Sequence, residues 1–356
     1  MPQASYTVTV GDVVASTLRN SRQEVVDNIF KKSAYLAKMA IDGRKQTTEG
    51  GYQINRSVEY ATNGTFQSFS GYDQVPIVPQ ETVTDAVFSW KEYAGNWVVS
   101  RREERLNSGK AKIRDLVKQK KSSLERSARE YLNGNLLNPS SFTSVGNGGK
   151  DLTPLSMLVS ISSSLTVGGI AESSNSWWAN QRKKAGSSNN TAQAGSAFVN
   201  ELRSFNNTCS QHGDGSPNFG IWGKELFETY MAVLDSKVRY GSVEMANIGF
   251  RTVMLDNMEI AWDQIVPGTS ANAAAIVAYN SGSKAEEIGF FLNTDYLYLI
   301  VDEATDFVLT DPVKHEANGQ YATSGSLLFM GEHCVTNRRA QGIYYGADVS
   351  AITLNT

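Results

Sequence analysis

Residues 88–116 read FSWKEYAGNWVVSRREERLNSGKAKIRDL, and the pattern of the chain changes within this stretch. The first half is rich in tryptophan, tyrosine and valine, which favour β-strands. In the second half Ser108 can serve as an N-cap, and apolar residues then recur at helical spacing until Gly134 offers an end. We therefore expect a long amphipathic helix over residues 108–133, directly after a strand.

The residues before this stretch predict an extended hairpin. Two β-prone runs within residues 46–100 flank a segment rich in Gly, Ser, Asn and Gln that carries Phe66, Phe69 and Tyr72. With roughly 20 residues per arm at about 3.3 Å each, such a hairpin could reach ~60 Å. It would extend beyond a small domain, so its aromatic side chains would need another surface to pack against.

The remainder of the chain mixes helices and strands without regular alternation, which predicts an α+β fold rather than a doubly wound sheet. A helical segment is expected before Asp42. Further helices are expected at 154–165, 197–205 and 224–238, and strands at 219–222, 251–255, 258–262, 290–292, 296–301, 327–329 and 342–345.

Composition excludes several classes of protein. The 33 basic and 36 acidic residues give a net charge of −3, which excludes a strongly basic nucleic-acid binder. Apolar runs stay shorter than the ~18–20 residues of a membrane helix, and we see no signal peptide. Two cysteines far apart in sequence, Cys209 and Cys334, fit a reducing compartment and exclude a disulfide framework.

Charge is unevenly distributed along the chain. Residues 1–130 hold 20 Lys/Arg and 15 Asp/Glu, a net charge of +5, whereas residues 220–316 hold 6 Lys/Arg and 15 Asp/Glu, a net charge of −9. This asymmetry indicates two faces with different surroundings, or two solvated surfaces that differ in composition. The basic helix over 108–133 could follow a phosphate backbone without reading sequence, or could simply be exposed.

Catalytic motifs are weak. Neither a phosphate-binding loop nor a dinucleotide-binding glycine motif occurs. His315-Glu316 begins like a zincin motif, but Gly319 stands where the second histidine should be. Ser281 and Lys284 match SxxK, yet they sit in a Gly/Ser turn without the partner motifs of that enzyme class.

For two further groups of polar residues a structural role is favoured over a catalytic or metal-binding one. Glu332-His333-Cys334 could suggest a Cys–His nucleophile, but adjacent strand residues point to opposite faces, so we expect a buried cysteine beside a partly exposed histidine. Four carboxylates could hold Ca²⁺ or Mg²⁺ but lack calcium-loop spacing, which favours a solvated acidic turn: Asp302, Glu303, Asp306 and Asp311. We expect no enzyme, cofactor or metal site.

The order of elements resembles the major capsid proteins of tailed bacteriophages, which have the Hong Kong 97 capsid fold. The resemblance covers about residues 10–350 and rests on the order and spacing of individually weak motifs. These are Phe88-Ser-Trp90-Lys-Glu-Tyr93, Asn107-Ser-Gly-Lys-Ala-Lys-Ile-Arg-Asp-Leu116, Gly168-Gly169-Ile170, Trp177-Trp178-Ala-Asn and Ser236-Lys-Val-Arg239-Tyr240.

The resemblance implies a role for each part of the chain. It assigns an N-terminal arm to 1–45, an extended loop over a neighbouring subunit to 46–100, a peripheral domain with a spine helix (108–133) to 101–194, an axial domain to 195–300 and a return to the peripheral domain to 301–356. Since about 45 residues precede the loop, it also implies a separate scaffold or a segment already removed.

The implied function is a non-enzymatic shell protein that self-assembles through hexamers and pentamers into an icosahedral capsid around double-stranded DNA. Implied partners are a portal, scaffolding proteins and a possible decoration protein, without a membrane, and the implied location is the virion capsid after assembly in the host bacterial cytoplasm. Alternatives are an encapsulin-like nanocompartment that encloses protein cargo, and a hydrolase using Ser281/Lys284 or Cys334/His333.

The resemblance also implies interface residues. We expect intersubunit contacts from Tyr52, Phe66, Phe69, Tyr72 and Trp90, and a basic surface facing the DNA from Lys118, Lys120 and Lys121. Some relatives join subunits through an isopeptide bond from a loop lysine. Residues 46–90 contain no lysine, so we expect no such cross-link here.

Overall fold

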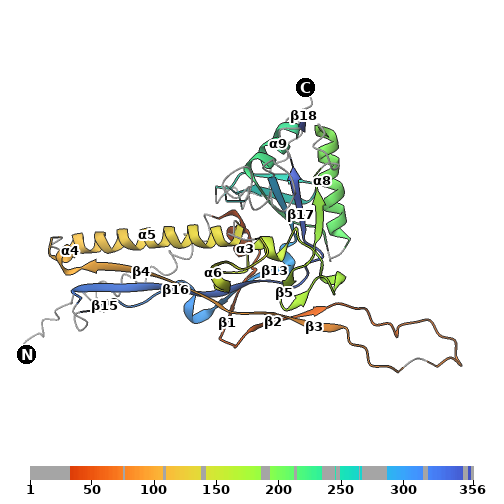
Figure 1. Cartoon of the computed structure of the whole chain (residues 1–356), viewed down its shortest axis with the longest axis horizontal. Coiled ribbons are helices and arrows are strands. Elements are labelled where there is room, and N and C mark those ends of the chain that lie inside the picture. Colours follow the sequence, from red (N-terminus) through yellow and green to blue (C-terminus); the bar gives the residue numbers. More distant parts are fainter. Residues whose placement is uncertain are drawn as a thin grey trace, which may run out of the picture.

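The computed structural model describes residues 33–74, 77–106, 110–137, 142–185, 193–211, 215–234, 245, 249–263, 265–266, 287–315, 320–347 and 352–353. Two six-stranded sheets organise this part of the chain, and a two-stranded hairpin projects away from both (Figure 1). The expected α+β class is therefore present. No helix of the described ranges has the length and apolar character needed to cross a bilayer.

The first sheet is long and narrow because one strand, β16 (Ala322–Val335), runs its whole length. Ten residues of β16 pair antiparallel with β4 (Lys91–Ser100), and its C-terminal end pairs with β13 (Leu297–Asp302). Three shorter strands complete the sheet: β1 (Lys45–Thr48), β14 (Val308–Leu309) and β15 (Val313–Lys314).

Helix α5 (Lys110–Leu137) lies along β4 and covers one face of this sheet (Figure 1). Two glycines allow close packing here. A Cβ atom on Gly95 would lie 2.6 Å from Cδ1 of Leu124 on α5, and one on Gly325 would lie 2.7 Å from three indole atoms of Trp97. Gly325 is directly opposite Trp97 in the β16–β4 ladder, so the indole occupies the space that the glycine leaves.

The second sheet has the order β10-β11-β9-β12-β17-β7 and packs against helices α8 (Gly195–Ser210) and α9 (Lys224–Leu234). Its central strand β9 (Phe219–Trp222) is buried along its entire length. The other members are β10 (Thr252–Leu255), β11 (Met258–Trp262), β12 (Glu287–Leu292), β17 (Gly342–Ala347) and β7 (Gln181–Lys184).

Three two-stranded sheets stand apart from these layers. The largest is the hairpin of β2 (Ile54–Glu59) and β3 (Val83–Phe88). The others are β5 (Thr166–Val167) with β6 (Ile170–Ala171), and β18 (Ile352–Thr353) with β8 (Gln193–Ala194). Short helices are α3 (Ala34–Ile41), α4 (Arg101–Leu106), α6 (Gly146–Gly149), α7 (Leu155–Leu158), η1 (Ser176–Trp178), η3 (Thr294–Tyr296) and η4 (Glu303–Thr305).

Several expected boundaries are wrong. Helix α5 continues through Gly134 to Leu137, because Leu136 and Leu137 are buried and extend its apolar contact. The helix expected at 154–165 is the single turn α7, and β16 is far longer than the strand expected at 327–329. Of the helical segment expected before Asp42, α3 is described and residues 1–32 lie outside the described residues.

A buried polar cluster joins α3 to β16. The Tyr35 hydroxyl is 2.6 Å from Nε2 of His333, whose Nδ1 is 3.1 Å from the carbonyl oxygen of Thr153. Because a carbonyl oxygen only accepts, Nδ1 carries the proton, and in the neutral imidazole Nε2 then accepts from Tyr35. Burial lowers the pKa of His333 to about 4. The expectation of a partly exposed His333 is wrong, because this end of β16 is covered on both faces.

Glu332, the preceding residue, has the opposite shift. Its side-chain oxygen Oε1 accepts hydrogen bonds of 2.8 Å from the backbone N–H groups of Thr153 and His333, yet burial dominates and raises the pKa of Glu332 to about 7. Between pH 4.5 and 7 the native protein keeps Glu332 protonated, whereas the unfolded chain ionises it. Its contribution to stability is therefore greatest below pH 4.5 and is lost as the pH rises to 7.

Glu332→Gln cannot ionise and should escape this loss. Its free energy of unfolding, relative to the parent protein, should rise by about 3 kcal/mol between pH 4.5 and 7. Denaturant unfolding across this range measures the difference, and the contribution of His333 cancels because both proteins carry it. Glu92→Gln, which removes an exposed carboxyl on β4, is the matched control. Parallel stability curves for Glu332→Gln and the parent would contradict the assignment.

Gly325→Ala should destabilise the protein by about 1–3 kcal/mol, because its Cβ would overlap the buried, rigid indole of Trp97. Gly134→Ala is the control. It lies within α5, meets no atom within 4 Å and should stabilise the helix by up to about 1 kcal/mol. Denaturant midpoints of the two variants should move in opposite directions; a neutral Gly325→Ala would show that the packing at Trp97 is loose.

Candidate assembly interface

The β2–β3 hairpin is anchored at its base by an alternating pattern of side chains. Ile54, Val58, Ala86 and Phe88 point into the core, and the side chains between them are exposed or half-buried. The backbone bond from Tyr60 N to Thr82 O, 3.0 Å long, continues the ladder one step beyond the two strands. The base of the loop is therefore part of the body.

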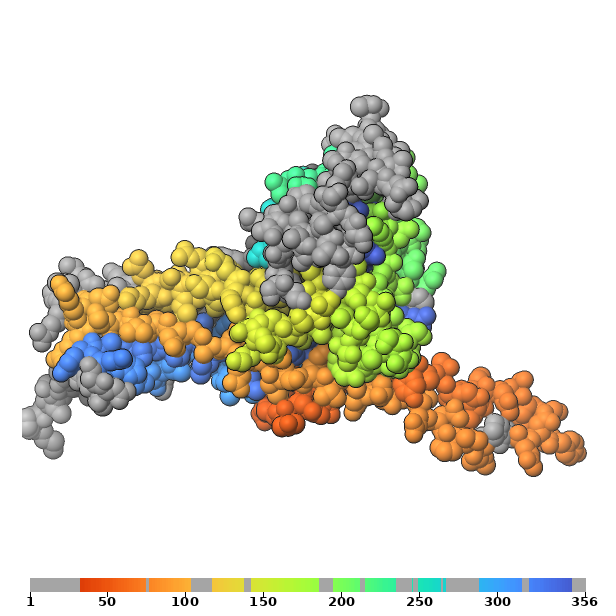
Figure 2. Space-filling view, viewed as in Figure 1, coloured from red at the N-terminus to blue at the C-terminus, as the bar shows by residue number. Residues whose placement is uncertain are grey.

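Beyond this ladder the chain forms an open loop without strand pairing among its described residues, 61–74 and 77–81. Local turns shape it: Asn63 Oδ1 accepts from the N–H and hydroxyl of Thr65, and Asp73 Oδ2 accepts from Ser70 N. Figures 1 and 2 show this segment projecting far from the rest of the molecule. We call residues 60–82 the loop tip.

Exposed apolar side chains gather on this loop. Four of the five aromatic residues expected at the interface are strongly exposed: Tyr52 (97%), Phe66 (95%), Phe69 (63%) and Tyr72 (103%). Eight of the thirteen exposed large hydrophobic side chains in the described chain lie within residues 46–90. Such concentrated apolar exposure is typical of surfaces that contact another molecule.

The fifth expected interface residue, Trp90, behaves differently. It is half-buried, packs against the core and donates its Nε1–H to the carbonyl oxygen of Gly51 at 2.9 Å. Trp90 therefore belongs to the base of the loop. Two further exposed apolar residues, Ile77 (99% exposed) and Val78 (57%), were not among the expected interface residues. The sequence signal for them is a short apolar run between two prolines.

The loop tip and helix α5 carry opposite charge. Residues 60–82 contain Asp73 and Glu81 and no lysine or arginine, whereas α5 contains eight basic and three acidic residues. An apolar, mildly acidic tip is complementary to an apolar surface that is bordered by basic side chains.

The three lysines expected to face DNA lie in different environments. Lys118 is exposed. Lys120 donates to the carbonyl oxygen of Val98 at 2.6 Å and pairs with Glu103 at 3.1 Å. Lys121 is 8% exposed and lies 3.6 Å from Glu125.

The expectation of a surface role for Lys121 is wrong for a simple reason. It lies one turn before Leu124, on the stripe of α5 that faces the sheet. Glu103, the partner of Lys120, forms a capping box with Ser100 at the start of α4. These hydrogen bonds, from Ser100 N–H first and then from Lys120, lower the pKa of Glu103.

The weak catalytic motifs gain no support. Both ring nitrogens of His333 are engaged by Tyr35 and Thr153, so the imidazole does not pair with Cys334. Cys334 is buried, and burial raises the pKa of its thiol. Ser281, Lys284 and Glu316 lie outside the described residues, and His315 bonds the hydroxyl of Ser324.

Asp302 and Asp306, two of the four acidic residues at the end of β13 and beyond it, bond within the protein. Asp306 pairs with Lys45 at 2.6 Å, and Asp302 accepts from Thr305 Oγ1 at 2.8 Å. Within the ranges that the structure describes, no three metal-ligating side chains come together.

Comparison with known proteins identifies the architecture. No family model matches the chain, and no curated protein matches its sequence. Among solved structures, a cyanophage A-1(L) capsid subunit aligns with a TM-score of 0.58 at 11% identity, covering 85% of this chain and 89% of that chain. The capsid of Myoviridae phage XM1 gives 0.51 at 10% identity, covering 87% and 92%.

The SrpI encapsulin of Synechococcus elongatus PCC 7942 is also similar, with a TM-score of 0.51 at 11% identity, covering 91% of this chain and 90% of that chain. These matches cover 85–91% of this chain and 89–92% of the other chains, so they concern most of the fold. With the geometry described above, they show that this chain has the Hong Kong 97 capsid fold.

Proposed function

We propose that this protein is the major subunit of an icosahedral capsid that assembles through hexamers and pentamers around double-stranded DNA. The observation that carries the proposal is the loop tip, which exposes aromatic side chains that its own chain cannot bury. The three exposed aromatic residues of the loop tip, Phe66, Phe69 and Tyr72, at about 150–250 Å² each supply roughly 450–750 Å² of contact surface. That is a large part of a standard protein–protein interface.

The distribution of charge supports a shell with two different faces. The basic N-terminal third and the acidic region after residue 220 carry net charges of +5 and −9. A basic inner face would screen phosphate repulsion, and Lys118 and Arg126 on the exposed side of α5 are the side chains that we assign to it. A portal, scaffolding proteins and a decoration protein complete the proposed set of partners, in a virion assembled in the bacterial cytoplasm.

An encapsulin-like compartment is the second candidate, because the SrpI encapsulin shares the fold. Both candidates predict closed shells, and they differ in content. The ratio of absorbance at 260 and 280 nm of particles purified from the native source separates them: nucleic acid supports the capsid, and protein cargo with little nucleic acid supports the compartment.

The triple variant Phe66→Ser, Phe69→Ser, Tyr72→Ser should remain folded but lose assembly, because these side chains make no contribution to the core of their own chain. Sedimentation velocity and negative-stain microscopy should show shells for the parent and free subunits for the variant. The control is Tyr321→Ser, which removes an exposed aromatic side chain on the body of the subunit. Normal shells from the triple variant would refute the loop contact.

Mature particles boiled in detergent should release a single band near the monomer mass of 38.9 kDa. Residues 46–90 contain no lysine, and the guanidinium of Arg56 stays protonated, so the loop has no amine nucleophile for an isopeptide bond. Electrophoresis beside the unassembled chain is the measurement. A ladder of oligomers resistant to detergent and reductant would contradict this expectation.

A further inference from the structure

The base of the extended loop needs support from outside its own strands. Strands β2 and β3 pair with each other and with neither six-stranded sheet, and a two-stranded hairpin is marginally stable alone. On the edge of β3 that faces away from β2, the N–H of Val87 donates to the carbonyl oxygen of Gly168 at 2.9 Å. The tight turn of the β5–β6 hairpin therefore lies directly against β3.

This contact requires glycine at the turn. Gly168 and Gly169 have φ values of +60° and +76°, as expected of a two-residue hairpin turn with both central residues left-handed. A Cβ atom on Gly168 would lie 3.0 Å from Cβ of Ala86 and 3.2 Å from Cζ of Phe88. The turn is thus fitted closely to the buried side of β3.

A second contact lies at the outer end of the ladder. The ring of Trp177 stacks on Tyr60 with centroids 5.2 Å apart and planes inclined by 29°. Tyr60 is also the residue whose backbone N–H bonds Thr82, where the loop tip begins. Residues 165–178 therefore contact the hairpin near both ends of its base, and we call them the buttress.

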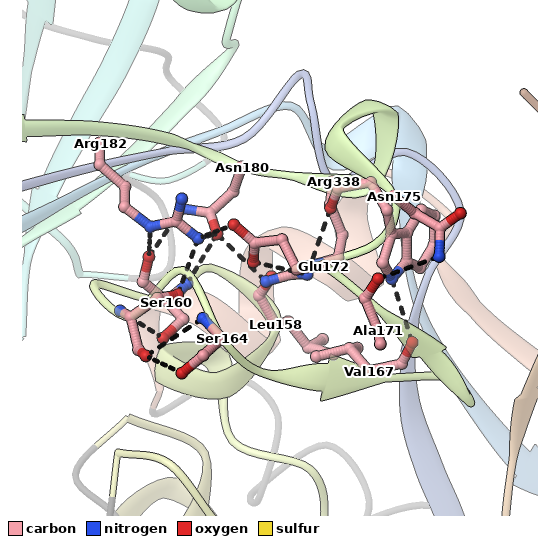
Figure 3. A network of polar contacts seen from close by, with 12 residues as sticks. Leu158, Ser160, Ser164, Val167, Ala171, Glu172, Asn175, Asn180, Arg182 and Arg338 are labelled. Atoms are coloured by element: carbon pink, nitrogen blue, oxygen red, sulfur yellow. Dashed lines mark hydrogen bonds and ion pairs between the residues drawn. The ribbon is translucent and has the colours of Figure 1, made fainter.

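The buttress is tied to the body by buried polar contacts (Figure 3). Within the buttress, Trp178 donates its Nε1–H to the carbonyl oxygen of Val167 at 3.0 Å. The carbonyl oxygen of Trp178 accepts from Arg338 Nη1, outside the buttress, at 3.2 Å. Arg338 is fully buried and also donates to the carbonyl oxygen of Leu158 at 2.7 Å. One arginine thereby bonds the chain at two separate points, Leu158 and Trp178.

Glu172, within the buttress, supplies the opposite charge. Its carboxylate accepts from Arg338 Nη1 at 3.2 Å and from Arg182 Nη2. Burial lowers the pKa of Arg338 to about 10 and the nearby Arg182 acts in the same direction, while Glu172 opposes both. Arg338 remains charged at neutral pH, and a buried pair with directional hydrogen bonds restricts the buttress to one geometry.

We propose that the buttress sets the direction in which the extended loop leaves the body, with Glu172 and Arg338 as positioning residues. The two contacts at the loop base and the buried network form one continuous path from the body to Tyr60. The proposal that this direction matters for assembly rests on the proposed function; the mechanical role of the buttress does not.

The loop direction can be measured in unassembled subunits with spin labels on Ser68→Cys at the tip and Ser123→Cys on α5, since both native cysteines are buried. Electron–electron resonance should give one narrow distance distribution in the parent. Trp177→Ala should broaden it, and Trp177→Phe, which keeps a stacking ring, should restore it. An unchanged distribution in Trp177→Ala would overturn the proposal.

Arg338→Met tests whether Arg338, which does not contact the hairpin, positions it through the buttress. It removes the bonds to Leu158 and Trp178 but leaves Glu172 paired with Arg182, so no buried charge is left alone. Amide exchange at Val87 should become roughly tenfold faster, although Arg338 does not contact β3. Exchange at the parent rate in a folded variant would remove Arg338 from the mechanism, and Trp177→Ala tests the buttress independently if Arg338→Met does not fold.

Comparing the distance measurements with the formation of shells separates this proposal from the proposed function. If the distances broaden in Trp177→Ala and its shells become irregular in size beside uniform parent shells, both proposals are supported. If the distances broaden but the parent forms no shells, the buttress stands and the proposed function fails. If distances are unchanged while the parent forms shells, the buttress is wrong and the proposed function stands.

Discussion

The β2–β3 hairpin belongs to neither large sheet, so side chains beyond its base have no core of their own chain to enter. Phe66 and Tyr72 remain almost wholly in water. Leaving several large aromatic side chains exposed on one projecting segment is unfavourable, and contact with another molecule removes that cost. The distribution of apolar surface in the subunit thus becomes reasonable when a neighbouring copy is included.

The body is built to hold this projecting element. Strand β16 pairs with β4 along ten residues and with β13 at its far end, and α5 is packed on the same layer through Gly95. The layer continues through β4 into the base of the loop, while the buttress supports the opposite edge of β3. The buried Arg338 and Glu172 connect the buttress to the second sheet. Arg338 lies shortly before β17 in the chain and Glu172 shortly before β7, and these two strands pair with each other.

Much of this arrangement was accessible from the sequence. The long helix, the α+β class and the aromatic hairpin follow from apolar periodicity and turn residues, and the order of motifs indicated the fold. Burial of individual polar residues could not be predicted: Lys121 has the same sequence pattern as its exposed neighbours, and His333 was expected to be partly exposed. Both environments are set by long-range packing, of α5 on the sheet and of α3 on β16. The Arg338–Glu172 pair, separated by 166 residues, left no local signal.

The most direct measurement is an electron cryomicroscopy reconstruction of the assembled particle in which the loop tip can be traced. The account predicts closed icosahedral shells in which Phe66, Phe69 and Tyr72 of each subunit are buried against a neighbouring copy. It is contradicted if shells form with these three side chains still in solvent, or if the loop folds back on its own subunit.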